Sequence, residues 1–309
     1  MKKINLFILF FIFISLFSFL YYFSFVGIQT KSFNKKIKDS INKFDENLGI
    51  QLDYVQLYLN IKDLNVEARI SNPKIIYKNE NIEIESLKSL ISIKSVINKE
   101  FALNNLDISS KSIKIQKILS LIRIINNSAE IYILHNKIKD GSLVADIKLN
   151  FDKNGKIRDD FEINGYLKDG QLDLLNEHNL NNINFIFKIK KNKYELNDIK
   201  FLLDEFDFSS KKIYLLNKDN FVNVEGDISN NFLLLKKEKI EKISKLFSQK
   251  YDFEKILFSS KNNFSFNIDN NFKFNKIFLN SEISLKELAF KNNKKGKYFL
   301  PEINNEIFL

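Results

Sequence analysis

Four residue types are absent or scarce in this chain of 309 residues: Cys and Trp do not occur, and there are two Pro and eight Gly. Without Cys the chain forms no disulfide and no cysteine-ligated zinc or iron–sulfur site. So few Pro and Gly exclude collagen-like and Pro-rich sequence. Hydrophobic residues make up 44% of the chain, which is too high a fraction for a disordered protein.

Arginine is also scarce. Of 48 basic residues only three are Arg, namely Arg69, Arg123 and Arg158, although the net charge is +10. Proteins that grip phosphates or read bases rely on the planar fork of Arg. The positive charge therefore reflects many Lys on solvated surfaces, and we expect no nucleic-acid partner.

Residues that carry catalysis are few. The chain has two His, His135 and His178, and neither belongs to an H-E-x-x-H motif. There is no G-x-S-x-G elbow and no Gly-rich phosphate loop. The carboxylate pairs Asp159-Asp160 and Asp204-Glu205 fit solvated turns, although such a pair can in principle do acid–base chemistry. The sequence predicts no enzyme, no catalytic residue, no cofactor and no metal site.

The N-terminus consists of one long apolar run. No charged residue occurs from Ile4 to Thr30; as a helix, this run would extend roughly 40 Å, and a bilayer core is roughly 30 Å thick. A cleavable signal peptide has a shorter apolar core followed by small residues. We predict an uncleaved signal-anchor transmembrane helix over residues 1–30. Its anchoring side chains would include Phe7, Phe11, Leu16, Leu20 and Phe23.

The next segment, residues 31–49, has one apolar stripe at helical spacing and Gly49 at the expected C-cap. The stripe consists of Phe33, Ile37, Ile41, Phe44 and Leu48. This amphipathic helix could pack its stripe on a sheet, or lie on lipid with its lysines toward the headgroups. The sequence leaves both interpretations open.

Beyond Gly49 the apolar residues alternate with polar ones, which is typical of half-buried antiparallel strands. We predict a β region over residues 50–232, a helix over 233–249, and further strands over 250–309 that are truncated if the chain is part of a longer protein. The segment from Ile113 to Ile125 fits either a strand leading into a helix or one continuous element. Hairpin turns are expected at Asp140-Gly141, Asn154-Gly155 and Asp169-Gly170.

The order of these segments resembles the N-terminal region of the AsmA-like family of bacterial envelope proteins, which includes TamB- and YhdP-type members. The matching features are the anchor, the helix ending in Gly and the strand ending at Asn72-Pro73-Lys74-Ile75. Two segments with recurring apolar residues, Leu87 to Ile97 and Phe101 to Ile115, also match. The resemblance covers residues 1–120 well and the remainder loosely. Members of this family are usually considerably longer.

The resemblance implies a member of the bridge-like lipid-transfer superfamily: a mainly β protein whose antiparallel sheet curls into an open apolar groove behind the two N-terminal helices. It also implies a single-pass inner-membrane protein with most of the chain in the periplasm, acting in outer-membrane biogenesis. The expected partners are phospholipid, the inner membrane and other envelope proteins. The candidate groove residues are Leu64, Val66, Ile91, Ile93, Leu143, Ile147 and Leu149.

The alternating strands also fit a filled β-sandwich or barrel whose Phe and Ile residues form an ordinary core. In that case the chain would be a membrane-tethered structural or assembly scaffold. A lipopolysaccharide-transport protein of the LptC-like type shares the anchor but does not need the second helix.

Overall fold

The computed structural model describes residues 2–44, 46–61, 65–78, 80–92, 105–125, 129–152, 156–174, 178–218, 220–246, 253–269 and 273–290, and most of their side chains from residue 10 onward. The chain is mainly β, and its strands form one large antiparallel sheet that is not closed. The residues divide into two compact units: unit 1 contains residues 1–135 and 143–165, and unit 2 contains residues 136–142 and 166–309.

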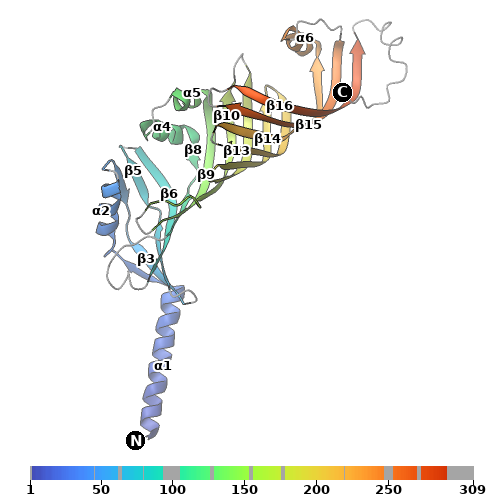
Figure 1. Ribbon diagram of the computed structural model, residues 1–309. Helices are drawn as coiled ribbons and strands as arrows, with labels where there is room; N and C mark the ends of the chain where they lie inside the picture. The colour runs from blue at the N-terminus through green and yellow to red at the C-terminus, as the bar shows by residue number, and fades with distance from the viewer. Residues whose placement is uncertain are drawn as a thin grey trace. The chain divides into compact units, whose positions relative to one another are not determined.

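Unit 1 begins with two helices, α1 (Lys2–Phe25) and α2 (Asn34–Phe44) (Figure 1). Among the described residues, no helix was found that is long and apolar enough to span a membrane. Helix α2 lies within the helix predicted over 31–49 and is shorter than predicted. Gly49 does not cap it, because Gly49 belongs to strand β2 (Leu48–Gln51).

The strands of unit 1 pair in the order β1-β3-β4-β6-β7-β9. Their bounds are β1 Ile28–Thr30, β3 Val55–Asn60, β4 Asn65–Ser71, β6 Glu80–Ser92, β7 Asn105–Ser110 and β9 Ile138–Asn150. A smaller sheet joins β2 to β5 (Lys74–Tyr77) and β5 to the first residues of β6. The long strand β6 therefore belongs to both sheets.

The core of unit 1 lies between α2 and the sheet. Phe33, just before α2, and Ile37 of α2 are buried in one cluster with side chains of β2, β3, β4 and β6. Val55 has no exposed surface and Ile91 has 1%. Burial at this level contributes about 1.5–3 kcal/mol for each large aliphatic side chain. The apolar stripe thus packs on the sheet and not in lipid, while the lysines of α2 lie on its other side.

Two further helices, α4 (Ile115–Ile125) and α5 (Ala129–Lys137), follow the two-residue strand β8 (Ile113–Lys114). The ambiguous segment from Ile113 to Ile125 is therefore a short strand leading into a helix. Leu119 and Leu121 of α4 are buried. The sequence did not predict α5, since its residues were interpreted as the end of a strand.

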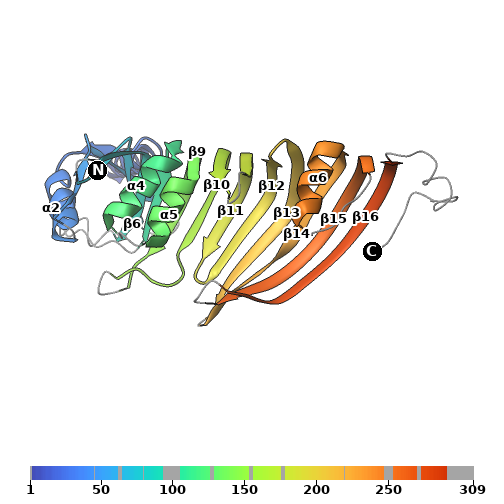
Figure 2. The same cartoon turned by 90° about the horizontal axis from the view of Figure 1, so that it is seen from above.

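In unit 2 the pairing order is β10-β11-β12-β13-β14-β15-β16, and Figure 2 shows these strands side by side. They are β10 Glu162–Asp173, β11 Asn179–Lys190, β12 Lys193–Leu203, β13 Phe206–Lys218, β14 Phe221–Lys236, β15 Phe253–Asp269 and β16 Phe274–Phe290. Helix α6 (Lys237–Leu246) contacts β14 and β15. The helix predicted over 233–249 begins later, because residues 233–236 continue β14.

Two of the expected hairpin turns are wrong. Asp140-Gly141 lies inside β9 and Asp169-Gly170 inside β10, where Asp169 has a φ of 52°. The third, Asn154-Gly155, lies outside the described residues. A residue with positive φ inside a strand is typical of a bulge, which bends the strand and shifts its alternation by one residue.

Candidate functional site

One face of the unit 2 sheet carries apolar side chains in continuous rows across the strands. In the first row the successive register partners are Phe187, Leu196, Ile213, Gly226, Phe264 and Leu279. In the second they are Ile189, Tyr194, Leu215, Val224 and Phe266. Because register partners lie on the same side of an antiparallel sheet, these rows define one surface, which we call the apolar face.

The apolar face continues past a line of bulges. Asp198 of β12, with a φ of 51°, is an extra residue relative to β11. It moves Ile199 and Phe201 onto the side that Leu196 occupies. Phe201 then stacks on Phe208, with ring centroids 5.6 Å apart. A single-parity pattern would have reversed the face at this point, so the bulges keep it apolar along the strands.

The cover on the apolar face is partial. All described strands of unit 2 belong to the single sheet, and α6 is the described helix that packs on it. Ile240 of α6 is buried, and the Lys239 ammonium lies 5.6 Å from the ring centroid of Phe206. Toward the other end of the strands, Tyr194 is 38% exposed and Leu279 65%. This end has an apolar surface that the described residues leave accessible.

The opposite face is polar and charged, and we call it the polar face. Its corresponding row consists of Lys188, Glu195, Tyr214, Glu225, Ser265 and Phe278. Lys212 lies 2.6 Å from Glu195 and 4.3 Å from the ring centroid of Tyr214. The hydrogen bond between the two side chains lowers the pKa of Glu195 below its usual value and raises the pKa of Lys212. This side of the sheet is therefore suited to water.

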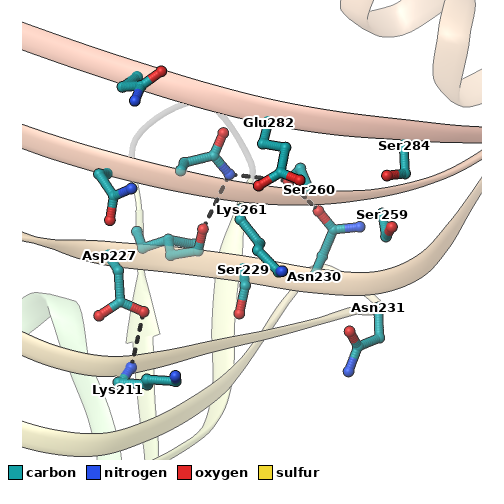
Figure 3. A pocket seen from close by; sticks show the side chains of 14 residues that line it. Lys211, Asp227, Ser229, Asn230, Asn231, Ser259, Ser260, Lys261, Glu282 and Ser284 are labelled. Atoms are coloured by element: carbon teal, nitrogen blue, oxygen red, sulfur yellow. Dashed lines mark hydrogen bonds between the residues drawn. The ribbon is translucent and has the colours of Figure 1, made fainter. Parts of the chain in front are cut away.

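The middle of β13–β16 contains a hollow of about 540 Å³ with a polar lining (Figure 3). Lys211, Asp227, Lys261 and Glu282 supply two charges of each sign. The remaining lining residues are Ile228, Ser229, Asn230, Asn231, Ser259, Ser260, Asn262, Asn263, Asn280 and Ser284. Both Asp227 carboxylate oxygens accept backbone hydrogen bonds, from Lys211 at 3.0 Å and Lys212 at 3.1 Å. An acyl chain would find no matching surface in this hollow.

The predicted groove residues of unit 1 are brought together on one side of its sheet. Val66 and Ile91 are direct register partners, and both lie in the packed core at 2% and 1% exposure. Ile147 and Leu149 of β9 pair with Ile108 and Leu106 of β7 and are half-buried. Leu143, also half-buried, has the same parity in β9. Leu64 and Ile93 lie outside the described residues.

The predicted anchor residues lie along α1. Phe11 and Leu16 are exposed at 67% and 54% of their surface. Leu20 is half-buried, and Phe23 packs against the core of unit 1. The side chain of Phe7 lies outside the described residues.

His178 and Asp204 lie 26 positions apart in the sequence, and the fold brings their side chains together. Nδ1 of His178 lies 2.8 Å from Oδ2 of Asp204, and the backbone amide of Asn179 donates to Oδ1 of the same carboxylate at 3.2 Å. Burial acts to raise the pKa of Asp204, but the two hydrogen bonds outweigh it and the pKa lies below its usual value. In the described part of the chain no group of three or more His, Asp or Glu side chains is placed to hold a metal ion.

The apolar face of unit 2 was not among the sites predicted from the sequence. The signal was present in the alternating Phe185, Phe187 and Ile189, and in Phe264, Phe266 and Ile268. What the sequence lacks is the register that aligns these runs with one another.

Comparisons of the chain with protein-family models, curated proteins and solved structures found no match.

Proposed function

We propose that this protein is a membrane-anchored, non-catalytic lipid-binding protein that holds phospholipid acyl chains against the apolar face of unit 2. In this proposal it is an AsmA-like protein of the bacterial inner membrane. The bulk of the chain lies in the periplasm, where it supports outer-membrane biogenesis. The single observation that carries the proposal is the pair of apolar rows across β11–β16, with only α6 packed on that face among the described elements.

Contact between the apolar face and water is unfavourable. Contiguous apolar surface that stays accessible to water on a folded protein marks a binding site. Each methylene of an acyl chain that leaves water for this surface contributes about 0.8 kcal/mol. The charged side chains of the polar face favour contact with water. In this proposal the apolar face of the same strands binds lipid and the polar face remains solvated.

The anchor is the second part of the proposal. Helix α1 contains 24 residues, and such a helix is about 36 Å long. Large apolar side chains, among them Phe11 and Phe17, project from it with 67% and 66% of their surface exposed. No charged residue occurs between Ile4 and Thr30. Burial of these side chains in a bilayer would remove that apolar surface from water.

The test is site-specific photo-crosslinking in cells that express the full chain. A benzophenone amino acid replaces either Phe264, on the apolar face, or Phe278, on the polar face of the neighbouring strand. Both positions hold Phe, so the two variants are matched in size. After irradiation, mass spectrometry of the purified protein identifies the attached molecules.

We expect phospholipid adducts at position 264 and few or none at position 278. Equal lipid labelling at both positions would show that the lipid contact has no face preference and would count against the proposal. Protein–protein adducts at position 264 with no lipid would contradict it directly.

The packed core of unit 1 favours a second function, that of a membrane-tethered scaffold. Val66 and Ile91 are almost fully buried, so this part of the sheet offers a firm protein surface and no space for an acyl chain. In the scaffold function the partners are envelope proteins. Cross-linking that captures one defined protein, together with lipid-free position 264, would favour this alternative.

A further inference from the structure

The end of α1 is held against the sheet of unit 1 by a closely packed junction. The backbone amides of Val26 and Gly27 donate to the carbonyl of Tyr22 at 2.8 and 3.1 Å, and Nε2 of Gln56 donates to the carbonyl of Val26 at 3.1 Å. Gly27 has a φ of 76°, and a Cβ there would lie 2.9 Å from the carbonyl oxygen of Leu57. Strand β1 then pairs with β3. The helix is therefore joined to the sheet without a flexible linker.

Helix α2 follows closely and presents a basic surface. Phe33 and Ile37 are buried in the core at 7% and 5% exposure, so this side of the helix faces the sheet. Four exposed lysines lie in this region. Lys31 follows β1, and Lys35, Lys36 and Lys38 lie on the outer side of α2. Among the described residues, Asp39 on the helix and Asp53 beside its first turn are the nearby exposed carboxylates, fewer than the four lysines. The exposed Glu46 lies beyond the other end of α2.

Distance along the chain places Lys31, the first of these lysines, near the end of α1, and α2 begins three residues later. Lys31 follows the three residues of β1, which extend by about 10 Å. That is close to the distance of about 8–10 Å over which salt screens charge in cells. Each lysine this close to an anionic membrane surface increases association roughly five-fold. Neutral headgroups would gain nothing comparable from the same surface.

We propose that Lys31, Lys35, Lys36 and Lys38 form a basic patch that binds the headgroups of anionic phospholipids in the membrane that α1 enters. This inference rests on the anchor of the proposed function, but it is independent of the apolar face. The patch holds unit 1 to the membrane surface and enriches anionic lipid where the β region begins.

The test uses the full chain reconstituted into nanodiscs of phosphatidylglycerol and phosphatidylethanolamine in equal amounts. Mass spectrometry of the released protein measures the ratio of the two lipids that stay bound. The test variant is Lys31→Gln, Lys35→Gln, Lys36→Gln and Lys38→Gln combined. The control variant removes the same charge from unit 2, through Lys188→Gln, Lys190→Gln, Lys193→Gln and Lys200→Gln.

We expect a several-fold excess of bound phosphatidylglycerol in the original chain and in the control, and a ratio near that of the nanodisc in the test variant. High salt reduces the excess in the original chain. An unchanged excess in the test variant, or a control variant that loses it equally, would overturn the patch. A chain that does not enter nanodiscs at all would instead contradict the anchor of the proposed function.

Discussion

At the scale of single residues, Gly226 shows how closely neighbouring strands constrain one another. It is the only small member of the row Phe187, Leu196, Ile213, Gly226, Phe264 and Leu279. A Cβ at this position would lie 2.9 Å from Cγ1 of Ile213 and 2.9 Å from the carbonyl oxygen of Lys212. Backbone atoms cannot move away cheaply, so any side chain here separates β13 from β14.

We therefore expect Gly226→Ala to lower the free energy of unfolding by about 1–3 kcal/mol. Gly49→Ala is the matched control, because its nearest neighbour would be 3.8 Å away, an ordinary contact distance. Denaturant unfolding of both full-length variants, followed by circular dichroism, measures the difference. Equal stability of the two variants would show that the strands separate freely at Gly226.

The pair of His178 and Asp204 should make the stability of the folded chain depend on pH. The pKa of Asp204 is lowered in the folded chain. The stabilisation from its ionised form is thus complete above the carboxyl's unfolded pKa and is lost as the pH falls through the folded value. Its side chain is 23% exposed, so screening by water limits the contribution to about 1 kcal/mol.

We expect Asp204→Asn to be less stable than the original chain near neutral pH and to lose less stability on acidification below about pH 4. Thermal unfolding across that pH range measures both effects. Asp207→Asn, on the next strand, serves as the control, since no hydrogen bond joins the Asp207 side chain to another described residue. Parallel pH profiles for Asp204→Asn and the original chain would contradict the assignment.

At the scale of elements, the sequence predicted the strand-rich body but not the bulges of unit 2. The alternation of apolar residues gave the strands correctly in most places, because burial on one face requires a period of two. Turn chemistry was less informative, since Asp-Gly pairs suit any backbone position with positive φ. Asp169-Gly170 meets that requirement inside β10 rather than at a hairpin. Only cross-strand register separates the two cases, and register is a tertiary property.

Helix limits show the same dependence on tertiary contacts. The stripe of α2 was predicted from spacing, and the packing of Phe33 and Ile37 confirms the packed alternative. Residues 233–236 have a helical pattern as well, yet they continue β14 because Leu233, Leu234 and Leu235 pair with β15. The partners in β15 are more than 20 residues away in the sequence, where local periodicity gives no information.

The bulge in β13 depends on one side chain of β14. The two backbone amides of Lys211 and Lys212 both donate to the carboxylate of Asp227. Between Ser209 and Ile213 the register of β13 against β14 shifts, so neither Lys211 nor Lys212 has a register partner in β14. Asp227 therefore satisfies the two donors that the bulge would leave unpaired.

We expect Asp227→Ala to lower the free energy of unfolding by about 2 kcal/mol, because it removes the acceptor of two backbone donors. Asn263→Ala, its register partner in β15, is the control and should change stability by less than about 0.5 kcal/mol. Hydrogen exchange should accelerate at Lys211 and Lys212 in the first variant alone. Slow exchange at both amides in Asp227→Ala would mean that another group holds the bulge.

At the scale of the whole molecule, the two units treat their apolar faces differently. In unit 1, α2 and the smaller sheet cover the face, and Val66 and Ile91 have almost no exposed surface. In unit 2 the corresponding side chains range from the buried Phe187 to the largely exposed Leu279. The choice between groove and filled core, which the sequence left open, is therefore decided by packing for unit 1, and for unit 2 the groove is our proposal. Packing explains unit 1, whereas the face of unit 2 is where a ligand would add cover.

Two adjacent leucines of β13 test this difference within one strand. Leu215 lies in a row of the apolar face, and Leu216 points to the polar face with 39% of its surface exposed. If Leu215 faced a filled core, Leu215→Asn would cost about 3–5 kcal/mol. On a face that only lipid covers, we expect a loss of about 1 kcal/mol in the lipid-free protein, similar to that of Leu216→Asn.

Added phospholipid should then give the two variants different stabilities, because a ligand that binds the folded state stabilises it more when its affinity is higher. Thermal unfolding of the full chain in detergent, with and without added phospholipid, should show a lipid-dependent rise for Leu216→Asn and a much smaller one for Leu215→Asn. A large lipid-independent loss for Leu215→Asn alone would identify this face as a closed core and favour the scaffold function.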